Sequence, residues 1–132
     1  MRRGILLHVG LLALFVVAAC NRGGPFGPDN QPEFSNDTNL FQWRATAMEN
    51  VTETQSFTWQ NTGGWAVVQA DPDLNGGNAL LRIWGAAATP VFARDLEMRL
   101  TAPTLLDTAG AWTIEIRLSG ASGSLDIRVE TP

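Results

Sequence analysis

Hydrophobic and polar residues alternate along most of the chain beyond residue 40. The clearest run is 112–119, which reads Trp-Thr-Ile-Glu-Ile-Arg-Leu-Ser. A period of two places successive side chains on opposite faces of a strand, so one face is apolar and the other polar. The alternation returns in 124–130 after a Gly-Ala-Ser-Gly turn, and we interpret the two runs as an antiparallel hairpin.

Shorter runs of the same kind lie upstream, separated by Gly, Pro, Asn and Asp residues. We expect these runs to form strands at 40–47, 53–60, 65–70, 78–84, 91–94 and 96–102. About seven to eight strands, spaced by about 8 to 12 residues, predict a single antiparallel β-sandwich. A small closed β-barrel is the alternative.

The first twenty residues have a different pattern. Arg2 and Arg3 precede an apolar run, Ile5 to Ala19, which is shorter than a typical membrane span and suits a signal peptide. The run ends in Val17-Ala18-Ala19-Cys20, which resembles the lipobox of bacterial lipoproteins. The resemblance implies cleavage before Cys20, a diacylglyceryl thioether on its sulfur, and an acyl chain on the new amino terminus.

This resemblance implies a location as well as a modification. Two or more acyl chains hold a protein stably on a membrane, whereas one chain gives only reversible binding. The partner expected from Cys20 is therefore the membrane of a bacterial cell envelope. Because Asn21, and not Asp, follows the cysteine, the resemblance favours the outer membrane.

Three segments follow from these patterns. Residues 1–19 are expected to form the signal peptide. Residues 20–39, which are rich in Gly, Pro and Asn after the cysteine, are expected to form the lipidated start and a flexible tether. Residues 40–132 are expected to form the β-sandwich domain.

Composition narrows the possible chemistry. The only His is His8 and the only Cys is Cys20, while Tyr and Lys are absent. The mature chain then lacks an imidazole base, a free thiol and nitrogen or sulfur metal ligands, so we expect no enzyme activity, no cofactor and no metal site. The chain is acidic, with 13 Asp and Glu against nine basic residues, which argues against a nucleic-acid partner.

Two tryptophans are candidate ligand-binding residues. The chain has five Trp, and exposed indoles stack on sugar rings because they combine an apolar face with an N–H donor. Trp65 and Trp84 are the candidates, because their neighbours do not fix which way they face. The competing interpretation is that aromatic residues simply favour strands and the core.

One loop has the spacing of a calcium site. Asp71-x-Asp73-x-Asn75-Gly76 matches the opening of EF-hand-like loops, in which oxygens at alternate positions wrap a cation. Arg82 stands where such a loop carries its bidentate acidic residue, and the competing interpretation is a polar hairpin turn.

The sequence therefore supports a functional class and leaves the partner open. From Gly77 to its end, the chain is similar in layout to secreted β-sandwich modules such as pre-peptidase C-terminal domains, without a diagnostic motif. Our main hypothesis is a non-enzymatic, lipid-anchored binding or structural module with an unknown protein or glycan partner. The alternatives are a carbohydrate-binding domain that uses exposed Trp and a calcium-stabilised adhesion or assembly module.

Overall fold

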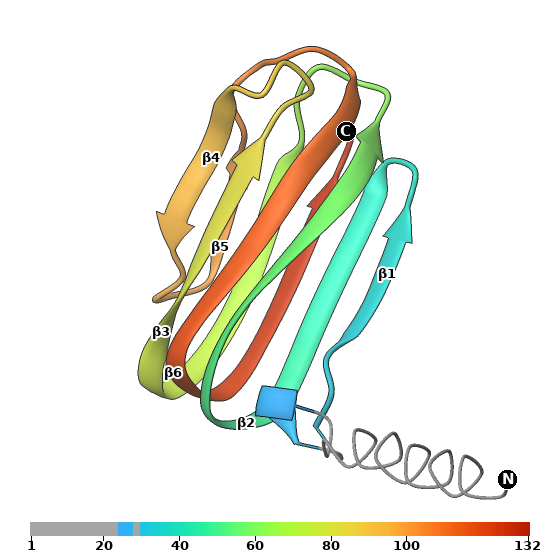
Figure 1. The fold of residues 1–132 in the computed structure, drawn as a ribbon. Helices are drawn as coiled ribbons and strands as arrows, with labels where there is room; N and C mark the ends of the chain where they lie inside the picture. Colours follow the sequence, from blue (N-terminus) through green and yellow to red (C-terminus); the bar gives the residue numbers. More distant parts are fainter. Residues whose placement is uncertain (1–23, 28–29) are drawn as a thin grey trace, which may run out of the picture.

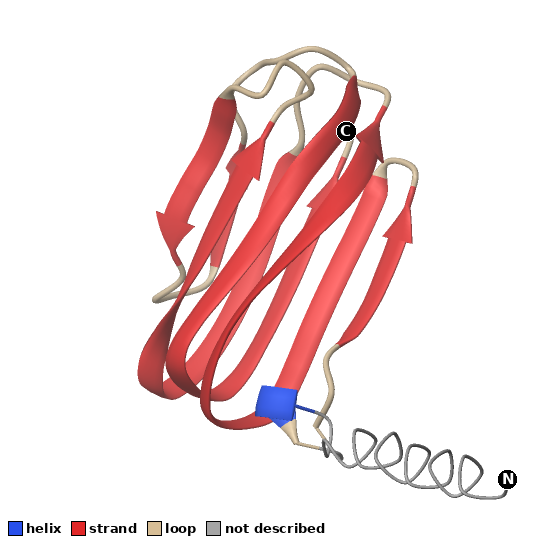
Figure 2. Ribbon diagram, in the orientation of Figure 1, coloured by secondary structure: helices blue, strands red, loops and turns tan. Residues whose placement is uncertain are grey.

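The computed structural model describes residues 24–27 and 30–132. In these residues, a short 3-10 helix and six strands follow one another in the order η1 (Gly24–Phe26), β1 (Glu33–Asp37), β2 (Leu40–Asn61), β3 (Val67–Trp84), β4 (Pro90–Asp95), β5 (Leu100–Pro103) and β6 (Gly110–Glu130). All strand pairs are antiparallel, which confirms the all-β class (Figures 1 and 2). No helix among these residues is long and apolar enough to cross a membrane.

The three long strands, β2, β3 and β6, each bend in the middle and contribute one half to each of two layers (Figure 1). Layer I consists of β1, residues 40–45 of β2, 124–130 of β6, 67–74 of β3, and β5. Layer II consists of residues 53–61 of β2, 110–119 of β6, 78–84 of β3, and β4. The strand order runs from β1 to β4 and is open, which confirms the sandwich and excludes the closed barrel.

The bends lie together at one end of the molecule, which we call the bend end (Figure 1). Their backbones approach so closely that only glycine fits. A Cβ on Gly77 would lie 2.1 Å from the carbonyl oxygen of Gly120, and a Cβ on Gly123 would lie 2.2 Å from that of Asp73. Both glycines have positive φ, which L side chains disfavour. The bends are therefore set by Gly positions in the sequence.

Side-chain hydrogen bonds join the bend of β2 to that of β6. The amide of Asn50 donates to Oγ of Ser122 over 2.9 Å, and the amide of Gly120 donates to Oγ1 of Thr52 over 2.9 Å. Register shifts in β2 between Ala45 and Glu53 accompany this turn of the strand. These contacts satisfy backbone groups that leave the regular ladder.

Bending explains two differences from the sequence prediction. Six strands replace the expected seven to eight, because pairs of predicted runs are halves of one bent strand. The predicted hairpin of 112–119 with 124–130 is wrong. These two halves of β6 lie in different layers, and each pairs with β2 and β3 instead. The sequence pattern does not distinguish the two arrangements, because two strands that each have an apolar face can stack across a core or pair within one sheet.

Two local predictions also differ from the structure. The predicted polar loop at 71–77 is extended backbone within β3, although its Gly76-Gly77 pair does mark the bend. The predicted strand 96–102 is shortened to β5. Leu96 is 1% exposed and Met98 is 72% exposed, so they do not share the apolar face that their spacing suggested.

The core lies between the two layers. Layer I contributes Phe41, Trp43, Leu125, Ile127 and Val129, while layer II contributes Trp59, Leu81, Ile83, Ile114 and Ile116, all within one buried cluster. Contacts cross from layer to layer at the β1 side. The indole N–H of Trp43 donates to Oε1 of Gln55 over 2.8 Å, and the rings of Phe41 and Phe57 lie 5.0 Å apart between centroids.

Part of the predicted tether belongs to the folded domain. Phe26 of η1 is only 6% exposed and packs edge-on against Trp43, with 6.4 Å between ring centroids. β1 pairs with β2, and its Phe34 packs against Phe57 at 4.9 Å. The domain boundary at residue 40 is therefore too late. The predicted signal peptide and Cys20 lie outside the described residues.

Replacing Phe26 tests whether η1 is part of the core. We expect Phe26→Ala to lower the free energy of unfolding by about 3 kcal/mol, because it removes a buried aromatic side chain. Phe34→Ala is the control, because Phe34 is 57% exposed and should cost about 1 kcal/mol or less. Urea unfolding measures both values. Equal losses would contradict the docking of η1.

Replacing Gly123 tests the bends. Gly123→Ala should cost about 3 kcal/mol, since its Cβ would collide with backbone and its φ is +118°. Gly27→Ala is the matched control, because Gly27 has φ +81° and no atom within 4 Å of the added Cβ. The control should therefore show only the conformational cost of about 1 kcal/mol. Chemical denaturation that ranks the two substitutions in the opposite order would refute this account.

Candidate functional site

The outer face of layer I carries a row of hydrogen-bonding side chains that crosses all five strand segments. Strand register sets the row, because residues directly opposite each other on adjacent strands share a face. In order across the sheet, the row consists of Ser35, Gln42, Arg128, Gln69 and Thr101. The row therefore has a guanidinium at its centre, an amide on each side and a hydroxyl at each end.

A second row beside the first is made of charged residues. It consists of Glu33, Arg44, Asp126 and Asp71 in register, with Arg99 next to Asp71. Arg44 pairs with Asp126 at 3.3 Å, and Arg99 pairs with Asp71 at 3.3 Å. These side chains are 43% to 77% exposed, so the pairs contribute little to stability and their polar atoms remain open to a ligand.

The two carboxylates in this row are direct neighbours. Asp71 of β3 lies opposite Asp126 of β6, and like charges that face each other across adjacent strands are destabilising. In both ion pairs, the arginine lies on the side of its aspartate that faces away from the other aspartate, because the strands run in the order β2, β6, β3, β5 across the layer. Neither arginine therefore stands between the two aspartates.

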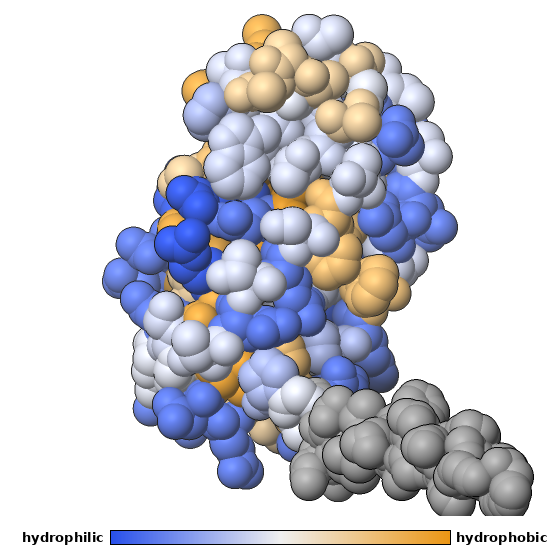
Figure 3. Space-filling model, in the orientation of Figure 1, coloured by the Kyte–Doolittle hydropathy of each residue, from blue (hydrophilic) through white to orange (hydrophobic). Residues whose placement is uncertain are grey.

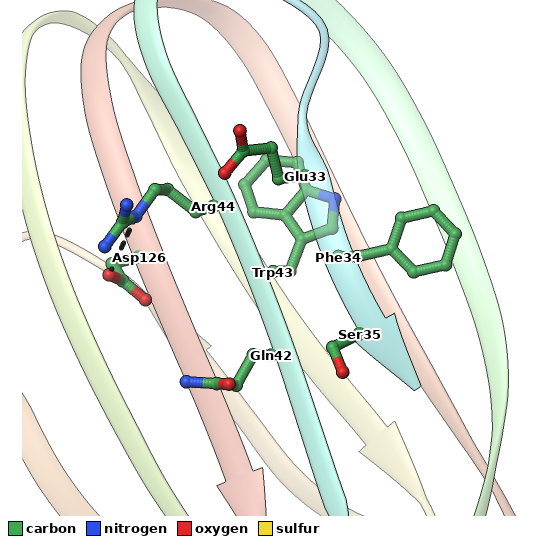
Figure 4. Close-up of a pocket in the computed structure, with 7 residues that line it drawn as sticks. All are labelled: Glu33, Phe34, Ser35, Gln42, Trp43, Arg44 and Asp126. Carbon is green, nitrogen blue, oxygen red and sulfur yellow. Dashed lines mark hydrogen bonds and ion pairs between the residues drawn. The ribbon is translucent and has the colours of Figure 1, made fainter. Parts of the chain in front are cut away.

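Three adjoining hollows lie over these rows. Their volumes are about 240, 410 and 460 Å³, and Asp126 lines all three. Figure 4 shows the first hollow, in which Arg44 and Asp126 are joined while Phe34 points to the other side of β1. We define the polar strip as the ten side chains of the two rows, all of which line the hollows: Glu33, Ser35, Gln42, Arg44, Gln69, Asp71, Arg99, Thr101, Asp126 and Arg128.

Trp84, one of the two predicted ligand-binding residues, lies on the opposite face of the sandwich. It sits on the outer face of layer II and is partly exposed. The guanidinium of Arg82 lies 5.1 Å from its ring centroid, and Arg82 also pairs with Glu115, with 2.8 Å between Nε and Oε1. Arg82 therefore occupies one face of this indole by a cation–π contact.

Trp65, the other predicted residue, lies at the loop end, which we define by the loops 62–66, 85–89 and 104–109 opposite the bends (Figure 1). Its side chain is 38% exposed, and Leu105 and Leu106 in the neighbouring loop are 68% and 77% exposed. Figure 3 shows apolar and weakly polar residues gathered at this end. Trp65 and Trp84 thus belong to different surfaces, and neither lies on the polar strip.

The other three tryptophans are core residues. Trp43, Trp59 and Trp112 are 0% exposed. Their indole N–H groups donate to Gln55, to the carbonyl of Asp37 and to the carbonyl of Thr108, at 2.8, 3.0 and 2.8 Å. These three residues therefore have the structural role, in strands and core, that competes with ligand binding as an interpretation of tryptophans in the sequence.

The spacing that suggested calcium does not form a wrapped loop. Asp71, Asp73 and Asn75 lie in the extended backbone of β3, and the carboxylate of Asp71 accepts hydrogen bonds from Arg99. Within the described part of the chain, no three acidic, His or Cys side chains gather as metal ligands do. The guanidinium of Arg99 neutralises the negative charge of Asp71, and a bound calcium ion would require that charge.

The polar strip was missed by sequence reasoning because it depends on register. The outward polar positions of 40–47 and 124–130 are visible as the second half of each alternating pattern. Which outward residue meets which is fixed only when β6 inserts between β2 and β3. The sequence feature that could have indicated the polar strip was the large number of long polar and charged side chains at those outward positions.

Comparisons with known proteins give fold-level likeness only. No family model and no curated protein matches the chain. PliG of Aeromonas hydrophila, a periplasmic inhibitor of g-type lysozyme, has a TM-score of 0.45 and 14% identity, covering 74% of this chain and 90% of PliG. A carbohydrate binding module from Cellvibrio mixtus lichenase 5A, in complex with cellotriose, has a TM-score of 0.41 and 18% identity, covering 78% and 87%. The 11S allergen of Cocos nucifera has a TM-score of 0.40 and 11% identity, covering 81% and 28%. At these scores the likenesses carry no argument about function.

Fluorescence quenching tests where the indoles lie. We expect acrylamide to quench Trp65 most, because it is 38% exposed while Trp43, Trp59 and Trp112 are 0% exposed. Trp65→Phe should remove the largest share of quenchable emission. Trp84→Phe is the control and should remove less, since Arg82 covers one face of that ring. An unchanged quenchable fraction in Trp65→Phe would contradict this placement.

Proposed function

We propose that the protein is a lipid-anchored binding module of the bacterial cell envelope. The lipobox Val17-Ala18-Ala19-Cys20 carries this proposal, because it supplies both the export signal and the lipidated residue. The polar strip is the surface proposed for ligand contact. It combines adjoining hollows with exposed donors and acceptors.

The docked η1 would hold the module close to its membrane. Phe26 follows Cys20 by six positions, and a fully extended chain of that length reaches about 20 Å. Phe26 packs on Trp43 at the bend end (Figure 1). With Cys20 in the bilayer, the bend end would face the membrane, and the loop end with Trp65 would point away.

Binding is proposed in place of catalysis because of the available side chains. Residues 21–132 contain no His, Lys, Tyr or Cys, so a reaction would have to rest on carboxylates or on Ser and Thr hydroxyls without a His partner. Asp126 and Asp71 on the polar strip each accept hydrogen bonds from the arginine with which they pair. Such groups suit recognition by hydrogen bonds better than proton transfer.

Exposed Trp65 supports a second location for ligand contact. Its indole is 38% exposed next to the apolar loop that carries Leu105 and Leu106. An indole of this kind suits stacking on a sugar ring. This location is the competing hypothesis for the ligand site of the same anchored module.

Replacing Cys20 tests the anchor. Cys20→Ala should abolish incorporation of labelled fatty acid and release the protein from the membrane fraction, because no other Cys is present. Asn21→Asp is the matched control. It keeps the cysteine and should keep the lipid, and enteric-type sorting should then retain it in the inner membrane. Membrane fractionation of Cys20→Ala that equals the wild type, without label in either, would refute the anchor.

A further inference from the structure

The balance of charge on the polar strip restricts its ligand. Three arginines and four carboxylates line the three hollows. A nucleic acid or another polyanion needs a clear excess of positive charge. A cationic peptide would need unpaired acids at the centre of the site, whereas the two central acids, Asp71 and Asp126, already pair with arginine. The matching ligand is therefore close to neutral.

The lack of apolar groups on the polar strip restricts the ligand further. Its ten members are all amide, guanidinium, carboxylate or hydroxyl side chains. The strongly exposed large apolar residues of the described chain are Phe34, Trp65, Met98, Leu105 and Leu106. Of these, only Phe34 borders a hollow, and it points to the other side of β1 (Figure 4). Protein interfaces depend on central aromatic or aliphatic anchors, so this surface suits a polar ligand.

The shape of the polar strip suits a chain molecule. Its first row crosses five strand segments, and adjacent strands lie about 4.8 Å apart, which gives a length of about 19 Å. Donors and acceptors follow one another along both rows, with Arg128 between Gln42 and Gln69. An extended ligand with donors and acceptors at short, regular intervals would meet a partner at each strand.

The neighbouring aspartates identify the groups that the ligand should offer. Asp71 and Asp126 lie opposite each other with no arginine between them. Their repulsion is reduced when a donor bridges them, and a neutral donor is sufficient because each carboxylate is already ion-paired. Adjacent hydroxyls of a sugar are such donors, since each O–H donates while its oxygen accepts from Arg or Gln.

We propose that the polar strip binds a neutral oligosaccharide chain laid across the strands of layer I. The proposal rests on the binding role proposed above and adds the chemical class of the ligand. The strands run from the bend end to the loop end, so a chain lying across them would run parallel to the membrane surface (Figure 1).

Titration calorimetry on the full-length chain in detergent micelles tests this site. The probes are cellohexaose and chitohexaose, and at least one should bind. Gln69→Ala should weaken that binding about fivefold, the loss of one net hydrogen bond. Gln60→Ala is the matched control, because Gln60 is also an exposed glutamine but lies on the outer face of layer II. The Gln60→Ala variant should bind the same hexasaccharide with wild-type affinity.

Two outcomes would overturn the polar strip as the glycan site. One is the absence of binding to either hexasaccharide at millimolar concentration. The other is binding that Gln69→Ala leaves unchanged and that Trp65→Ala or Trp84→Ala abolishes, which would move the site to the tryptophans. Membrane fractionation of the same protein reports separately on Cys20. A glycan result therefore leaves the anchor untouched, and loss of the anchor leaves the calorimetry interpretable.

Discussion

The close contact of three bent strands is the constraint on which the rest of the structure depends. At the bend end, the carbonyl of Gly120 lies where a Cβ of Gly77 would stand, and the carbonyl of Asp73 lies where a Cβ of Gly123 would stand. Because β6 lies between β2 and β3 in both layers, all three strands must turn at the same level. Loss of one bend would break the register of both layers.

This shared bend turns one alternating pattern into two different outer surfaces. Inward residues of both halves meet in a single core, with Trp43 of layer I hydrogen-bonded to Gln55 of layer II. Outward residues separate into the polar strip on one side and the face with Trp84 and Arg82 on the other. The same register that closes the core therefore places Asp71 beside Asp126.

The N-terminal segment links this core to the proposed anchor. Phe26 packs on Trp43, and β1 covers the edge beside Phe57, so residues expected to form a flexible spacer are part of the domain. Sequence reasoning missed this because isolated aromatics among Gly, Pro and Asn show no period. A partner for Phe26 exists only once β2 has folded.

The sequence by itself determined the all-β class and the inward and outward faces of the long alternating runs 112–119 and 124–130. These features are local, since they depend on neighbouring residues or on composition. Only the tertiary structure decided that 112–119 and 124–130 stack across the core without pairing, and that Gln69 and Arg128 share a row with Gln42. An alternating pattern fixes which face a side chain occupies, but strand order and register arise from contacts between residues far apart in the chain.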